Sequence, residues 1–288
     1  MNEAYQTVIT ASDEERRDLF LGTAARLGTA VQNVEKDFWV CWTLDALFNG
    51  LEPGGPRLLF KGGTSLSKAF GLISRFSEDI DITVFREDLH QDVDVAELEA
   101  MSGKKRRARL DEIRDACRAY IDGPFFSQLQ ARAAASIPDG RFRLERDHDD
   151  PDGQSLLLWY PAVTARENDY IRSAVKIESG AKSALDPHTP ATVRPYVDDD
   201  LPGQELEVSN VVTVKPERIR HRVAHFRSLH RDDLARVTQF LRDIDSGFWR
   251  FCTSYNDPRP VLPQSNDPVV EHFLGFDLLP WGETGAGK

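Results

Sequence analysis

Residues 58–85 have the sequence LLFKGGTSLSKAFGLISRFSEDIDITVF, and this stretch predicts the fold around it. The apolar run Leu58–Phe60 suits a buried strand. The turn 62–65 that follows consists of small residues, which leave backbone N–H groups open to the approach of an anion. We expect a short helix from Leu66 to Ile73, after which the chain returns as a second strand from Ile80 to Phe85.

The second strand carries two carboxylates on one face. Asp79 and Asp81 alternate with Ile80 and Ile82, so the apolar side chains face a core and both acids share the other face. Acids two residues apart on a strand lie about 7 Å apart at their Cα atoms. Their side chains can converge on one Mg²⁺ or on a pair of ions roughly 4 Å apart. Each motif alone is usually an ordinary turn or strand edge, but an anion-binding turn facing metal-ready carboxylates is typical of nucleotidyl transfer.

The stretch resembles the signature of the AbiEii-type toxin nucleotidyltransferases, a branch of the polymerase-β-like superfamily that includes the MenT-like proteins. That signature joins a Gly-Gly-Thr/Ser turn to an Arg-x-Ser-x-Asp-hydrophobic-Asp strand, which here runs from Arg75 to Asp81. The segment Glu35–Trp39 and parts of Asp150–Pro161 match the family as well. The resemblance extends over roughly residues 30 to 240.

The resemblance implies an α+β nucleotidyltransferase fold, with a mixed sheet flanked by helices, an NTP as substrate and Mg²⁺ as cofactor. It also assigns roles within the stretch. The resemblance implies that the β- and γ-phosphates are held by Gly62, Gly63, Thr64 and Ser65. It implies that Mg²⁺ is bound by Asp79 and Asp81. Ser77 is expected to orient these two acids.

A second stretch that carries candidate site residues is Ala174–Glu178. As a strand it places Lys176 and Glu178 on one face, so that a carboxylate from a neighbouring strand can join the two aspartates. The alternative from the pattern alone is an ion pair on a solvated sheet face. The family has the same Lys-hydrophobic-Glu strand, and the resemblance implies that Glu178 is a third metal ligand or general base and that Lys176 holds triphosphate oxygens.

The C-terminal part departs from the family pattern. Residues 214–231 are rich in cations and predict a basic helix. The family's helical Glu-Lys pair falls on Arg222 and Val223, which puts phosphate binding by that helix in doubt, although Lys215 or Arg222 could substitute. A later family motif places Asp233 at the site, and the alternative for Asp233 is an ordinary helix ion pair.

Three other motifs carry no function. The acid-rich loop 147–153 does not fit a calcium register, because Trp159 stands where the bidentate glutamate belongs, and it predicts a hairpin loop. His221 and His225 have a zinc-ligand spacing, but Arg222 replaces the glutamate of the metalloprotease motif, so we expect no zinc. The glycine-rich end 282–288 imitates a P-loop without its strand, helix or Ser/Thr, and we expect a disordered tail.

Composition limits the classes of protein further. The net charge of −11 over 288 residues argues against broad, charge-driven nucleic-acid binding, although five cations in the six residues 104–109 could contact phosphates. Most such runs are solvated helix faces. No apolar run is long enough for a membrane span, the N-terminus lacks signal-peptide features, and three distant cysteines suit reduced thiols, so we expect a cytoplasmic protein.

We expect residues 1–205 to form a nucleotidyltransferase domain with N-terminal helices at 12–27 and 32–48, and residues 206–288 to form a C-terminal helical region. The loop 186–203 is expected to end the sheet domain, and Gly123-Pro124 to end a helix that begins near Gly103. The resemblance implies a toxin of a bacterial toxin–antitoxin or phage-defence pair, with a cognate antitoxin as partner and a tRNA 3′ end as acceptor. The alternatives are a weakened homologue that binds nucleotide or RNA, and an antibiotic nucleotidyltransferase.

Overall fold

The computed structural model describes residues 1–71, 79–165, 172–183 and 188–215. All of them lie in one compact unit, Met1–Arg218. The helices of this part are α1 (Ala4–Ile9), α2 (Asp13–Leu27), α3 (Val31–Asn49), α4 (Gly62–Lys68), α5 (Val95–Ala100), α6 (Gly103–Tyr120) and α7 (Phe126–Ser136), with shorter turns at η1 (Arg86–Leu89), η2 (Ile121–Phe125), η3 (Pro138–Gly140) and η4 (Asp198–Asp200). The strands are β1 (Leu58–Lys61), β2 (Asp79–Val84), β3 (Arg143–Arg146), β4 (Ser155–Trp159), β5 (Ala174–Gly180), β6 (His188–Val193) and β7 (Val208–Val214).

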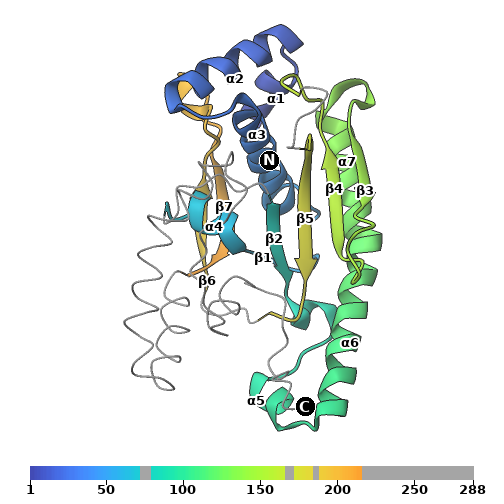
Figure 1. The fold of residues 1–288 in the computed structure, drawn as a ribbon. Helices are drawn as coiled ribbons and strands as arrows, with labels where there is room; N and C mark the ends of the chain where they lie inside the picture. The colour runs from blue at the N-terminus through green and yellow to red at the C-terminus, as the bar shows by residue number, and fades with distance from the viewer. Residues whose placement is uncertain (72–78, 166–171, 184–187, 216–288) are drawn as a thin grey trace, which may run out of the picture. The chain divides into compact units, whose positions relative to one another are not determined.

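The strands form one seven-stranded mixed sheet with the order β3-β4-β5-β2-β1-β7-β6. The pairs β2–β5 and β1–β7 are parallel, and the other neighbours are antiparallel. The expected α+β class, a mixed sheet flanked by helices, is confirmed (Figure 1). Residues 58–85 supply β1 and β2, which lie with β5 in the middle of the sheet.

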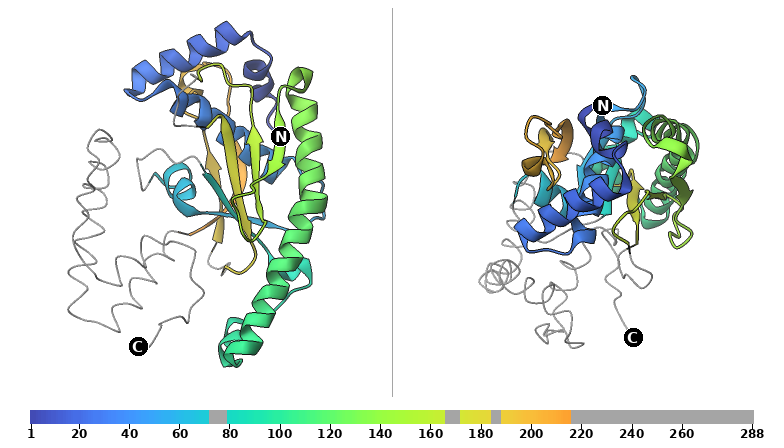
Figure 2. Two further views of the ribbon diagram at one scale, coloured as in Figure 1. Left: turned by 45° about the vertical axis from the view of Figure 1, so that its right-hand side comes forward. Right: turned by 90° about the horizontal axis from the view of Figure 1, so that it is seen from above.

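One face of the sheet packs against helices and forms the core. Ile80 and Ile82 of β2 and Ile177 of β5 are fully buried there. Helix α3 packs against β7, β5 and β2, and α6 packs against β5 (Figure 2). Helix α3 is apolar on most of its circumference and is buried from Val34 to Leu47, as expected of a helix enclosed on all sides. Asp79 and Asp81 of β2, with Lys176 and Glu178 of β5, lie on the opposite face of the sheet.

The helices predicted at the N-terminus are confirmed. Helix α2 begins with a capping box, in which the Glu15 N–H donates to the Ser12 hydroxyl (3.2 Å) and the Ser12 N–H donates to the Glu15 carboxylate (2.9 Å). Helix α3 follows, and its Phe38 and Trp42 are buried in the core. The hairpin predicted around the acid-rich loop is also present, as the antiparallel pair β3–β4.

Two predicted boundaries of secondary structure are wrong. The loop expected at 186–203 contains β6, which pairs with β7, and Pro190 is tolerated there because β6 is the edge strand of the sheet. The helix α6 does not end at Gly123-Pro124 but continues through the wide turn η2 into α7, because a five-residue turn accommodates a proline that has no N–H to donate.

The sheet also extends beyond residue 205, because β7 (Val208–Val214) pairs with β1 and buries Val208, Val211 and Thr213. The division into a nucleotidyltransferase domain and a C-terminal helical region stays a prediction, since residues 216–288 lie outside the described part. The expected basic helix beyond Lys215, the zinc-spaced histidines and the tail also lie outside the described residues.

No helix within the described ranges is long and apolar enough to cross a membrane. Two of the three cysteines, Cys41 and Cys117, are buried free thiols. Burial raises the pKa of the Cys117 thiol to about 12, so this thiol stays protonated and unreactive at neutral pH. Cys252 lies outside the described residues.

Candidate functional site

The chain bends sharply where β1 passes into α4. Gly62 has φ +74°, a conformation that favours glycine, and the helix begins at this residue. The expectation of a separate turn at 62–65 followed by a helix from Leu66 is therefore wrong, because the small residues themselves form the first turn of α4. Gly62, Gly63, Thr64 and Ser65 thus lie at the start of the helix, directly after the central strand β1.

The two hydroxyls of this turn are bound within the fold. The buried Thr64 hydroxyl donates to the carbonyl oxygen of Asp79 at 2.5 Å, and the buried Ser65 hydroxyl donates to the carbonyl oxygen of Gly62 at 2.9 Å. Both hydroxyl protons are therefore committed to backbone oxygens. Contact between this turn and an anion falls to its backbone N–H groups.

Gly62 and Asp81 are in close contact. A Cβ atom at Gly62 would lie 2.0 Å from Oδ2 of Asp81 and 2.7 Å from its Cγ. No other residue type fits at position 62 without moving this carboxylate, so the glycine is required both for its backbone conformation and for space. The start of α4 therefore forms one wall beside the Asp81 side chain.

The register of the central strands brings the predicted acids together. Asp81 is the partner of Glu178 across the parallel pair β2–β5, and Asp79 is the partner of Lys176. Partners in register share a face of the sheet, so the expected placement of Glu178 beside Asp81 is observed. All of these side chains are half-buried, as expected at the floor of a site rather than on a freely solvated face.

Lys176 is held between two carboxylates. Its ammonium lies 2.6 Å from Oε1 of Glu178 and 3.2 Å from Oδ2 of Asp147. Burial lowers the pKa of Lys176, but the hydrogen bonds and charges of Glu178 and Asp147 outweigh it and raise this pKa above its ordinary value. The Lys–Glu pair that the pattern allowed is therefore present, but it lies next to Asp81 at the centre of the sheet. Asp147 is an unexpected member, since the sequence places it only in a hairpin loop.

Lys61 is a second cation that the sequence analysis missed. It is the register partner of Asp81 on the other side, across β1–β2, and its Nζ lies 3.9 Å from Oδ1 of Asp81. Its side chain is 15% exposed, so it points into the site rather than into solvent. The signal that could have found it is its position directly before the glycines, on the strand next to the acids.

These carboxylates fit a magnesium ion that shares its coordination with a substrate. Across the four described ranges, no three His, Cys, Asp or Glu side chains are grouped closely enough to hold a metal ion by themselves. Mg²⁺ is usually held by one or two carboxylates together with substrate phosphates and water, so such a group is not required. Asp79 and Asp81, spaced two apart on one face of β2 and next to the glycine turn, could provide these carboxylates.

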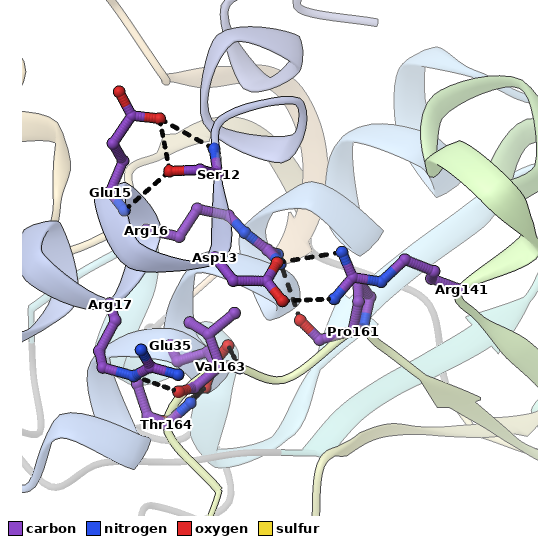
Figure 3. Close-up of polar contacts among 10 residues, drawn as sticks. All are labelled: Ser12, Asp13, Glu15, Arg16, Arg17, Glu35, Arg141, Pro161, Val163 and Thr164. Atoms are coloured by element: carbon purple, nitrogen blue, oxygen red, sulfur yellow. Dashed lines mark hydrogen bonds and ion pairs between the residues drawn. The ribbon is translucent and has the colours of Figure 1, made fainter.

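A polar network holds Val163 and Thr164, which follow β4 in the chain (Figure 3). The buried Glu35 carboxylate of α3 accepts the N–H groups of Val163 (2.7 Å) and Thr164 (3.0 Å), and Arg17 of α2 donates to the Val163 carbonyl oxygen (2.9 Å). Burial raises the pKa of Glu35 although these hydrogen bonds oppose it. Both residues are thereby held to the same helix that lies behind the sheet.

The remaining predicted site residues cannot be placed. Ser77 lies in 72–78 and Asp233 in 216–288, and both ranges are outside the described residues, as are Arg75, Arg222 and Val223. Their roles stay predictions.

Comparison with known proteins gives the family. The model of the family described as "Nucleotidyl transferase AbiEii toxin, Type IV TA system" matches residues 45–220, which is more than half of the chain. The chain belongs to the AbiEii nucleotidyl transferase toxin family. Among solved structures it is similar to MenT4, a nucleotidyltransferase toxin from Mycobacterium tuberculosis H37Rv, with 19% identity over 68% of this chain and a TM-score of 0.34. The match spans 55% of the MenT4 chain. A search of curated proteins gave no match.

The AbiEii match confirms the resemblance seen in the sequence. It covers the α4 turn, both aspartates of β2 and the Lys176–Glu178 pair of β5. It does not reach Glu35 and Asp37 on α3, nor Asp233. The described part of this AbiEii protein therefore contains the acidic residues of the expected site. It also contains the start of α3, which lies outside the matched region and contacts segments within it through Glu35 and Asp37.

Proposed function

We propose that this protein is a Mg²⁺-dependent nucleotidyltransferase toxin that transfers NMP from an NTP to an acceptor hydroxyl, the 3′ end of a tRNA. The observation that carries the proposal is the acidic centre of the sheet. Asp79 and Asp81 on β2 share one face with Glu178 on β5, beside the glycine turn that starts α4. Membership of the AbiEii family supports the same reaction class.

In this proposal each group of site residues has its own role. Asp79 and Asp81 hold Mg²⁺, which when bound neutralises charge on the phosphates of the NTP. The turn Gly62 to Ser65 binds the β- and γ-phosphates through the backbone N–H groups that the first turn of α4 leaves without a partner inside the helix, and Lys176 contacts the same triphosphate from β5. These contacts orient the α-phosphorus toward the acceptor.

Glu178 serves as the general base. Its carboxylate lies beside Asp81, where it can accept the proton of the acceptor hydroxyl while the hydroxyl oxygen bonds to the α-phosphorus and pyrophosphate leaves. Its side chain is 42% exposed, so an acceptor from solvent can reach it. In the resting protein Glu178 is paired with Lys176, and binding of the triphosphate by Lys176 would release the carboxylate for this task.

The tRNA acceptor and the phage-defence setting are proposed from the resemblance of the sequence, and the site geometry does not select them. An RNA acceptor is compatible with the exposed cations Lys104, Lys105 and Arg107 on the first turns of α6. We further propose a role in a toxin–antitoxin or phage-defence pair, with a cognate antitoxin as partner and Ser77 and Asp233 as further site residues.

The test is nucleotide transfer by the purified chain. The protein is incubated with each α-labelled NTP and total tRNA, with Mg²⁺ or with EDTA, beside the variant Asp81→Ala. We expect label on the tRNA only for the unmodified protein with Mg²⁺. Glu145→Gln is a matched control, because Glu145 is a sheet carboxylate that accepts the Trp159 indole N–H at 2.7 Å, three strands from β2.

Other outcomes would replace the proposal. NTP binding without transfer to any acceptor would make the chain a nucleotide-binding homologue, and label transferred only to an aminoglycoside would make it an antibiotic nucleotidyltransferase. Transfer that persists in EDTA or in Asp81→Ala would contradict the assignment of the metal to β2. For the toxin role, expression of the chain should arrest bacterial growth, and Asp81→Ala should not.

A further inference from the structure

A buried ion pair joins the far end of α4 to α3. The ammonium of Lys68, the last residue of α4, contacts the carboxylate of Asp37 on α3. Both side chains are almost completely buried, with 7% of Lys68 and 1% of Asp37 exposed. A buried charge pair of this kind costs desolvation, and apolar residues of similar size often stabilise a protein as well or better. Stability alone therefore gives no reason for charges at these two positions.

Both members of the pair also contact the segment that precedes η4. The other carboxylate oxygen of Asp37 accepts the backbone N–H of Tyr196 at 2.7 Å, while Lys68 donates to the carbonyl oxygen of Arg194 at 3.1 Å. The Lys68 ammonium lies 3.8 Å from the centre of the Tyr196 ring. Lys68 is thus contacted from three sides, and these contacts hold the end of α4 to α3 and to the segment before η4.

The other end of α4 supports both metal-ready acids. Gly62 lies against the carboxylate of Asp81, and the Thr64 hydroxyl holds the backbone carbonyl of Asp79. Helix α4 has only seven residues, so a shift at Lys68 is transmitted to Gly62 within two turns. The position of the acids therefore depends on the position of the whole helix.

We propose that Asp37 and Lys68 are positioning residues of the nucleotidyl-transfer site, which fix α4 so that Gly62 and Thr64 hold Asp81 and Asp79 in their metal-binding geometry. The inference rests on the proposed function for the role of the two aspartates. It adds two residues that touch neither metal nor substrate, and one of them lies outside the part of the chain that matches the family.

The decisive variant replaces the pair by apolar residues of similar size, Asp37→Leu with Lys68→Met. This double variant leaves no buried lone charge, so it should still fold, with a melting temperature lowered because the Tyr196 N–H loses its acceptor. We expect it to bind Mn²⁺, as a substitute for Mg²⁺ in the presence of NTP, at least about tenfold more weakly, because small displacements of positioned groups have large effects. Amide hydrogen exchange over residues 64–68 should also become faster.

Asp45→Asn is the matched control. Asp45 lies on the same helix, is equally buried, and accepts the Asn2 N–H at 2.6 Å and the Asn49 side-chain amide at 2.9 Å, without contact to α4. This variant should lower the melting temperature but leave Mn²⁺ affinity and α4 exchange unchanged. Lys68→Arg, which keeps the charge, should restore part of the lost affinity relative to Lys68→Met.

The two proposals fail in different ways. A double variant with unchanged Mn²⁺ affinity and unchanged α4 exchange would overturn the positioning role, even if the unmodified chain transfers nucleotides. If α4 exchange rises in the double variant while the unmodified chain binds neither Mn²⁺ nor NTP, the pair does fix α4 and the proposed function is overturned.

Discussion

The carboxylate of Asp81 lies so close to Gly62 that a Cβ atom there would come within 2.0 Å of Oδ2. Gly62 directly follows the last residue of β1 and Asp81 lies on β2, and the two meet because Lys61 and Asp81 are partners in the β1–β2 register. The glycine turn and the acidic strand are thus one structural unit, in which neither residue can change without affecting the other.

We predict that Gly62→Ala lowers both stability and transfer. The new methyl group must displace Asp81, and the positive φ adds strain of about 1–3 kcal/mol. NTP turnover should fall at least about tenfold, because Asp81 leaves its metal-binding position. Turnover is measured with labelled NTP and stability by denaturant unfolding.

The control for this substitution is Gly28→Ala. Gly28 ends α2 with φ +65°, but no atom lies within 4 Å of a Cβ at that position. This variant should carry the strain without any loss of turnover. Equal turnover in the two alanine variants would contradict a role for the contact between Gly62 and Asp81.

We predict that Glu178→Gln reduces turnover about 100-fold or more, because the amide cannot accept the proton of the acceptor hydroxyl. NTP binding should change little, since Lys176 keeps its second partner Asp147 at 3.2 Å. The measurement is single-turnover transfer together with NTP affinity by calorimetry. A large loss of affinity with unchanged transfer at saturating NTP would instead make Glu178 a binding residue.

We predict that Lys61→Met raises the KM for NTP about tenfold, the size expected for one charge-assisted contact. The prediction rests on the position of Lys61 beside Asp81 and directly before the glycine turn. Lys61→Arg should restore most of the lost affinity, because it keeps the positive charge. If kcat falls and KM does not change, Lys61 acts on the chemical step and not on binding.

We predict an acid-sensitive component of stability at the N-terminus of α2 (Figure 3). Hydrogen bonds from Arg141 and Arg16, together with their charges, lower the pKa of Asp13 to about 2. Because the folded-state pKa is depressed, this contribution is complete above the ordinary value near 3.8 and is lost as the pH falls toward 2. Asp13 is solvent-exposed, so screening keeps the effect small.

The measurement for Asp13 is the melting temperature of the unmodified protein and of Asp13→Asn between about pH 5 and about pH 2. The difference between the two should shrink as the pH falls through this window, and it should be smaller at high salt. A difference that does not depend on pH would show that the carboxylate charge contributes nothing.

The central strands could be predicted because their pattern is strong. The alternation of Asp79 and Asp81 with isoleucines, and the same period around Lys176, identify a sheet with one apolar and one acidic face. The α4 helix could not be placed correctly, since Gly62 and Gly63 favour a turn by composition and only tertiary contacts make them part of a helix. Pro190 hid β6 for a similar reason, because a sequence does not show which strand will be at the edge.

The supporting contacts of the site could not be predicted at all. Glu35, Lys36 and Asp37 form a charged triplet that suits a helix surface, yet all three are buried in α3. Their partners are distant in sequence, as Asp37 and Lys68 show, and no local pattern connects them. The one available signal is that three charges stand between Val34 and Phe38, at the start of a run of core residues.

The three strands that carry the acids and lysines are the innermost of the seven, with two further strands on either side. Local opening of a sheet begins at its margins, where hydrogen bonds are fewest, and the interior exchanges most slowly with solvent. Among the seven strands, we therefore expect the backbone beneath Asp81 and Glu178 to exchange most slowly. It behaves as a rigid template, and any adjustment to different nucleotides falls to rotations of the side chains above it.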